Sequence, residues 1–162
     1  MGEIVALRPE IYVQPGESHT VTGAVILRTI LGSCVGITFW APEHNCAALC
    51  HPMLPVCPVK ADMSISAGSR YVDYAIRDLA RWFRARGIRE NEVRVKLFGG
   101  ADVLMAGRGS GRPTVGKLNS EAALRVLSDE GFEIAASSLG GNFGLNIRFD
   151  TGSGEIQLKR LN

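Results

Sequence analysis

The run from residue 24 to 41, AVILRTILGSCVGITFWA, constrains the fold more than any other part of the chain. Most of its side chains are β-branched, aromatic or otherwise apolar, and β-branched and aromatic residues are enriched in strands. Gly32 and Ser33 interrupt the run, and a glycine lets the backbone turn sharply at that point. We therefore predict two strands, AVILRTIL and VGITFWA, that are joined or kinked around Gly32-Ser33.

Further strands are predicted on both sides of this run. A short first strand, EIYVQPG, ends at Pro15-Gly16, and the segment GESHTVTG with His19 that follows is predicted to be a loop. The later strand-like segments are CAALCHPML, EVRVKLF, FEIAASSLGG, LNIRFD and EIQLKRL. The last two are joined by TGSG, which predicts a hairpin turn.

Two segments carry a helical pattern instead. From Ser66 to Arg86 apolar residues recur every four positions, and Gly87 follows as a typical residue at the end of a helix. A second helix is predicted to begin near Asn119 or Ser120 and to close at Gly131. Runs of strands with two separate helices predict an α+β fold: a layered, β-sandwich-like core of mixed strands with two flanking helices.

Length and charge limit the classes of protein to which the chain can belong. With 162 residues it is close to the commonest domain size, so we expect one domain over residues 1–162. Its 18 basic and 16 acidic residues give a net charge of +2, which offers no electrostatic basis for nucleic-acid binding. No apolar run approaches the ~18 to 20 residues that span a bilayer, and the N-terminus lacks signal-peptide features. We therefore expect a cytoplasmic protein without direct membrane insertion, whose thiols stay reduced.

Cys34 follows the glycine turn directly and has two interpretations. It is an ordinary buried thiol, or it is a nucleophile beside an oxyanion site built from backbone N–H groups near Gly32, Ser33 and Cys34. A nucleophilic thiol needs a base nearby. A hairpin between residues 35–40 and 46–54 would bring His51 beside Cys34, although His51 taken alone is more typical of a satisfied core or edge histidine.

A zinc site is the competing interpretation of the same region. Cys46, Cys50, His51 and Cys57 supply four soft ligands within a short segment. The spacing contains no CxxC pair, however, and the adjacent Cys50 and His51 would point to opposite faces of a strand. The glycine-rich segment GRGSGRP at 107–113 matches neither a dinucleotide-binding nor a P-loop pattern. The residues therefore favour a site without metal or cofactor.

Several motifs in a fixed order carry a resemblance to a known family. They are LGSCVGI at 31–37, HPMLP at 51–55, YVDYAIRDL at 71–79, KLFGGADV at 96–103, VGKLN at 115–119, GGNFG at 140–144 and the closing TGSGEIQLKRL. Together they resemble CheD, the chemotaxis protein that deamidates glutamines on chemoreceptors. The resemblance extends from about residue 3 to 161, and the ordered set is far more specific than any one of its short motifs.

This resemblance implies a cysteine-dependent protein-glutamine glutaminase with a Cys-His-Thr triad. Cys34 matches the nucleophile of the family, His51 matches the catalytic histidine, and Thr29 is the matching threonine before the LGSC motif. The reaction would release ammonia through a cysteine thioester, with no metal or cofactor. The resemblance also implies a fold similar to the catalytic domain of cytotoxic necrotizing factor.

The partners that the resemblance implies are the cytoplasmic helices of methyl-accepting chemoreceptors, as substrates, and a CheC-type phosphatase. A second function therefore stays open, in which the chain acts mainly as a non-catalytic regulatory partner of CheC. The joint presence of Thr29, Cys34 and His51 favours the enzyme, because a pure binding module does not need all three.

Overall fold

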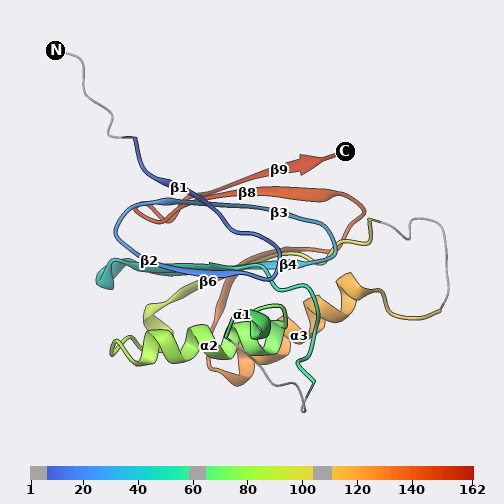
Figure 1. Cartoon of the computed structure of the whole chain (residues 1–162), viewed down its shortest axis with the longest axis horizontal. Helices are drawn as coiled ribbons and strands as arrows, with labels where there is room; N and C mark the ends of the chain where they lie inside the picture. Colours follow the sequence, from blue (N-terminus) through green and yellow to red (C-terminus); the bar gives the residue numbers. More distant parts are fainter. Residues whose placement is uncertain (1–6, 59–64, 104–110) are drawn as a thin grey trace.

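The chain forms three layers, a sheet on a sheet on helices, in a computed structural model that describes residues 7–58, 65–103 and 111–162 (Figure 1). The first sheet has the strand order β1-β3-β8-β9: Glu10–Tyr12, Ile26–Leu31, Gly144–Asp150 and Ile156–Leu161. The second sheet has the order β2-β5-β4-β6-β7: Ser18–Thr22, Cys46–Cys50, Val35–Ala41, Arg94–Gly99 and Ile134–Leu139. The helices are α1 (Ile65–Gly68), α2 (Val72–Arg84) and α3 (Val115–Asp129), with 3₁₀ turns at Pro42–His44 and Glu90–Glu92.

The central strands β4 and β5 of the second sheet are buried on both faces, and their residues alternate between two cores. On β4, Val35, Ile37 and Phe39 pack towards α2 and α3, where they join one large apolar cluster. The opposite face packs against the first sheet, where Leu49 of β5 meets Phe149 of β8. Successive side chains of a strand point to opposite faces, so they pack alternately against the helices and against the first sheet. The predicted α+β class and the sandwich-like core with flanking helices are confirmed, and the likeness to cytotoxic necrotizing factor stays a prediction.

The chain crosses from one sheet to the other at Gly32–Cys34. The strand before this turn, β3, pairs with β8 in the first sheet, and the strand after it, β4, pairs with β5 and β6 in the second. The predicted break at Gly32-Ser33 is therefore a change of sheet rather than a kink in one strand. Cys34 consequently lies at the end of the sandwich, where the two layers meet.

Several predicted elements differ from the structure. The helix expected from Ser66 to Arg86 is split into α1 and α2, because Tyr71 forms a β-bridge with Leu54 and the Val72 N–H donates to the Leu54 carbonyl (2.8 Å). The second helix begins at Val115, before the predicted start, because the Thr114 side chain accepts from the Lys117 N–H (3.2 Å) and caps it.

The third difference is an unexpected strand. Residues 18–22, which the polar sequence SHTVT led us to predict as a loop, form the edge strand β2 beside β5. Its residues are half-exposed, so the apolar signal of a strand is weak there. Part of the segment GRGSGRP lies outside the described residues. Within the described ranges, no helix is long and apolar enough to cross a membrane.

Candidate active site

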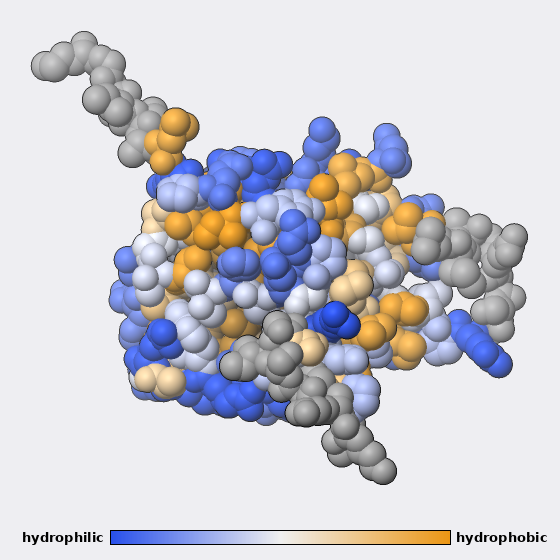
Figure 2. Space-filling view, in the orientation of Figure 1, coloured by the Kyte–Doolittle hydropathy of each residue, from blue (hydrophilic) through white to orange (hydrophobic). Residues whose placement is uncertain are grey.

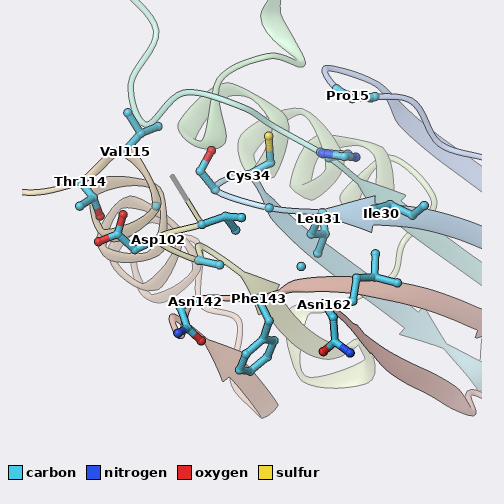
Figure 3. Close-up of a pocket in the computed structure, with 18 of the residues that line it drawn as sticks. Pro15, Ile30, Leu31, Cys34, Asp102, Thr114, Val115, Asn142, Phe143 and Asn162 are labelled. Atoms are coloured by element: carbon cyan, nitrogen blue, oxygen red, sulfur yellow. The ribbon is translucent and has the colours of Figure 1, made fainter. Parts of the chain in front are cut away.

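A cavity of about 1070 Å³ opens at the end of the sandwich where the chain changes sheets. Its wall includes Cys34 and His51 together with residues from the start of α3 and the ends of β8 and β9 (Figure 3). Around it, Ile30 and Val115 are nearly half exposed despite being apolar. Figure 2 shows hydrophobic side chains gathered at this end of the molecule, over the end of β9 and beside the start of α3. The cavity thus combines a small number of polar groups with apolar walls, as ligand sites commonly do.

Hydrogen bonds to its three carbonyl groups fix the turn Gly32–Cys34. The carbonyl of Gly32 accepts a hydrogen bond from the Ala101 N–H (3.0 Å), and that of Cys34 accepts one from the Gly100 N–H (2.8 Å). The carbonyl between them, that of Ser33, accepts one from a side-chain amide of α3 (3.0 Å). All three carbonyls of the turn are therefore fixed by the protein.

Fixed carbonyls also fix the amide groups that share their peptide planes. In a trans peptide the N–H of the next residue points opposite to the carbonyl. The Ser33 and Cys34 N–H groups therefore point away from the segments that hold the turn. Among the described residues neither donates to a group of another residue, although the Cys34 N–H interacts with its own sulfur. Two amides that donate to no other residue, placed beside a thiol, are donors that an oxyanion could use.

The hairpin predicted to bring Cys34 and His51 together is present. Strands β4 and β5 pair antiparallel with Ile37 opposite Cys50, and the Val35 N–H continues the ladder to the carbonyl of residue 52 (3.3 Å). Extending this register by one residue places His51 opposite Gly36. Cys34 and His51 are then diagonal neighbours on one face of the sheet, and both line the cavity. The strand β5 itself ends at Cys50, earlier than predicted.

Thr29 reaches His51 from the other sheet. Its Oγ1 lies 2.6 Å from His51 Nδ1 and donates a hydrogen bond to the Val13 carbonyl (2.8 Å). A hydroxyl has one proton, so Thr29 accepts from His51 and Nδ1 carries the hydrogen. The other ring nitrogen, Nε2, is then the basic one. The His51 backbone is held as well, by hydrogen bonds to the turn at residues 16–17 (2.7 and 2.9 Å).

Burial keeps the His51 imidazole and the Cys34 thiol neutral. His51 is 1% exposed, and this desolvation lowers its pKa from 6.5 to about 4. Desolvation likewise raises the pKa of the Cys34 thiol above its ordinary value, against a smaller lowering effect of its own backbone N–H. At neutral pH the pair is therefore a thiol beside a free imidazole, which is a base able to accept the thiol proton.

The four residues of the alternative zinc site do not converge. Cys46 and Cys50 pack into the core on the helix side of the second sheet, whereas His51 contacts Thr29 between the sheets. The described residues contain no group of three or more histidine, cysteine or acidic side chains placed to hold a metal. Burial also raises the pKa of Cys50 to about 12, so this thiol stays protonated.

Several groups of the site were not predicted from the sequence. The Val13 carbonyl and the Gly100 N–H act through the backbone, so no side-chain pattern reveals them. Asn119 on α3 supplies the amide that binds Ser33. It lies on the buried stripe of α3 with Ala123 and Val126, and a polar residue on an apolar stripe was the available signal.

A family model and the sequence relatives of this chain indicate the same family. The family model described as CheD chemotactic sensory transduction matches residues 53–160. The probable chemoreceptor glutamine deamidase CheD 2 of Geobacter sulfurreducens is 42% identical over 154 residues, 95% of this chain and 91% of that protein. The probable chemoreceptor glutamine deamidase CheD of Maridesulfovibrio salexigens is 35% identical over 155 residues, with 93% and 91% covered.

Solved structures of low similarity were also found. YlmD from Geobacillus stearothermophilus has a TM-score of 0.48 at 16% identity, over 76% of this chain and 50% of that chain. The hypothetical protein YfiH of Bacillus licheniformis has a TM-score of 0.49 at 11% identity, over 75% of this chain and 50% of that chain.

Proposed function

Because this chain belongs to the CheD family, we propose that it deamidates glutamine side chains of chemoreceptors to glutamate, using Cys34 as the nucleophile. The observation that carries the proposal is the hydrogen bond between Thr29 and His51 beside Cys34 on one cavity wall. We further propose that the protein works in the cytoplasm, because the receptor helices that would be its substrates lie there. We also propose that it acts as one catalytic domain, because both sheets contribute to the site.

In the first half-reaction, the glutamine carboxamide enters the cavity and its carbon meets the Cys34 sulfur. His51 Nε2 takes the thiol proton as the sulfur–carbon bond forms, so the thiolate never needs to accumulate. The amide oxygen becomes an oxyanion that accepts hydrogen bonds from the Ser33 and Cys34 N–H groups. The imidazolium gives its proton to the amide nitrogen, the intermediate collapses, and ammonia departs. A thioester between the Cys34 sulfur and the glutamine carbonyl carbon remains.

In the second half-reaction, a water molecule attacks the thioester carbon while His51 Nε2 removes one of its protons. Collapse of the second oxyanion breaks the sulfur–carbon bond, and the imidazolium returns the proton to the Cys34 sulfur. The sum is glutamine plus water giving glutamate plus ammonia. Thr29 holds the imidazole through Nδ1 in both steps, so that Nε2 remains the atom that moves protons.

The test is mass spectrometry of a receptor cytoplasmic fragment after incubation with the protein. Conversion of an amide to an acid adds about 1 Da to the peptide that carries the glutamine. Cys34→Ala should abolish this gain, whereas Cys57→Ala, a change at the other partly exposed thiol, should leave it intact. A Cys34→Ala protein that still deamidates the fragment would refute the assignment.

The binding-module alternative requires a separate measurement. We propose a CheC-type phosphatase as a partner, and the half-exposed apolar side chains around the cavity, such as Ile30 and Val115, could support such a contact. Capture of purified CheC, measured on the same preparation as deamidation, separates the two functions. Binding by both wild type and Cys34→Ala, with deamidation by neither, would favour the regulatory partner.

A further inference from the structure

Asn119 of α3 joins the two segments that carry the reactive residues. Its side chain is fully buried, and Nδ2 donates hydrogen bonds to the Ser33 carbonyl (3.0 Å) and to the Met53 carbonyl (2.9 Å). Ser33 immediately precedes Cys34, and Met53 follows His51 on the HPMLP segment. One side chain therefore ties the nucleophile turn to the histidine segment.

The identity of the side chain follows from its partners. Both partners are backbone carbonyls, which only accept hydrogen bonds, so the amide nitrogen must face them with both of its hydrogens. The remaining oxygen, Oδ1, is buried and has no hydrogen-bond partner among the described residues. An unpaired buried oxygen is unfavourable for stability. The two hydrogen bonds that the side chain donates therefore explain why residue 119 is an amide.

The bond to Ser33 also orients the Cys34 N–H, because both belong to one peptide plane. Turning the Ser33 carbonyl towards Asn119 turns the Cys34 N–H in the opposite direction, where among the described residues it meets no acceptor of another residue. We propose that Asn119 is a positioning residue that aims the Cys34 N–H at the oxyanion, with its second bond to Met53 as the anchor. This inference rests on the proposed role of Cys34 as a nucleophile.

The helix that carries Asn119 cannot move away from the turn without breaking close contacts. A Cβ at Gly116, in the first turn of α3, would lie 2.4 Å from the Ala101 carbonyl oxygen. A Cβ at Gly100 would lie 2.0 Å from the Ser120 hydroxyl. The start of α3, marked by Thr114 and Val115 in Figure 3, thus lies against the same segment whose N–H groups hold the rest of the turn.

The experiment compares two reactions of the same thiol. Attack on p-nitrophenyl acetate forms a bond from the Cys34 sulfur to the ester carbon, expels p-nitrophenolate and passes through an oxyanion. Alkylation by iodoacetamide displaces iodide at a saturated carbon and forms no oxyanion. Both are followed by mass spectrometry of the Cys34 peptide. Neither needs the receptor, so a failure of the proposed function is distinguishable from a failure of this inference.

Asn119→Leu should slow acylation by about tenfold or more, because loss of one oxyanion donor costs about 10² to 10³ in rate and here the donor is misdirected rather than removed. Alkylation should change by less than about threefold, because it needs no oxyanion donor. Asn91→Leu, at an exposed site far from the cavity, is the matched control and should change neither rate. An unchanged acylation rate would overturn the proposal. An equal fall of the acylation and alkylation rates would also overturn it, because it would indicate a general loss of structure.

Asn119→Asp supplies a second variant with a distinct readout. A carboxylate would repel the two carbonyls, whereas a protonated carboxyl can donate one hydrogen bond again. Its acylation rate relative to wild type should therefore recover as the pH falls from 7.5 to 5, and that of Asn119→Leu should not. His51 remains a free base over this range, because its pKa is about 4. The same pH response in both variants would contradict the role of the donated hydrogen bond.

Discussion

Burial of His51 predicts that acid weakens the fold within a defined range of pH. The folded protein holds the imidazole at a pKa of about 4, whereas an unfolded chain returns it to water and to its ordinary value of 6.5. Between these values the unfolded state binds more protons than the folded state. The free energy of unfolding therefore falls as the pH falls, and the contribution of His51 is fully present only above about pH 6.5.

The size of this effect follows from the two pKa values. At about 1.4 kcal/mol per pH unit, the interval from 6.5 to about 4 corresponds to about 3 kcal/mol. About 2 kcal/mol of this is lost between pH 7.5 and 5.0, where the unfolded imidazole becomes charged and the folded one does not. Typical domains have ~5 to 15 kcal/mol in total, so the loss should be easy to measure.

Guanidinium unfolding at pH 7.5, 6.0 and 5.0 tests this prediction in the wild type and in His51→Gln. The variant lacks the titrating ring, and all other ionisable groups are common to both proteins and cancel in the difference. The stability of the wild type relative to the variant should fall by about 2 kcal/mol over this range. A constant difference would show that the folded-state pKa of His51 is not lowered, and a rise towards acid would show a protonated ring in the folded state.

Other changes test the same site and its support. The acid limb of kcat/KM should have its midpoint near pH 4, because His51 must be neutral to accept a proton; a midpoint near 6.5 would contradict this. Thr29→Val should lower kcat by about tenfold to a hundredfold by releasing the imidazole, while Thr29→Ser retains most activity in the same assay. Gly100→Ala should lower the melting temperature far more than Gly111→Ala, because both have positive φ but only the first Cβ meets other atoms. Cys50 should resist alkylation in the folded protein, as peptide mapping can show, because its fully buried thiol has a pKa of about 12.

The sequence predicted those parts of the molecule that local patterns determine. Strands such as VGITFWA were recognisable because both faces of β4 are almost fully buried, which requires a continuous apolar run. The hairpin that brings Cys34 and His51 to one face follows from strand pairing alone. By contrast, β2 lies at a sheet edge with half-exposed side chains, so its sequence carries little apolar signal.

Features that depend on long-range contacts were not predictable from one sequence. The break between α1 and α2 arises from a backbone bridge between Leu54 and Tyr71, and the spacing of apolar residues along this segment does not predict it. The hydrogen bonds of Thr29 with Val13 and of Asn119 with Ser33 connect distant segments through backbone carbonyls. A carbonyl is present at every residue, so only the fold determines which one takes part.

The position of the site at the change of sheets has a mechanical consequence. Thr29 belongs to the first sheet and His51 leads out of the second, so their 2.6 Å contact spans the interface between the layers. A slide of one sheet over the other would break this contact while every ladder within each sheet stayed intact. In the proposed mechanism the rate of turnover therefore depends on how the two sheets are aligned. Substitutions at remote inter-sheet residues such as Phe149 should alter this rate without changing the cavity wall.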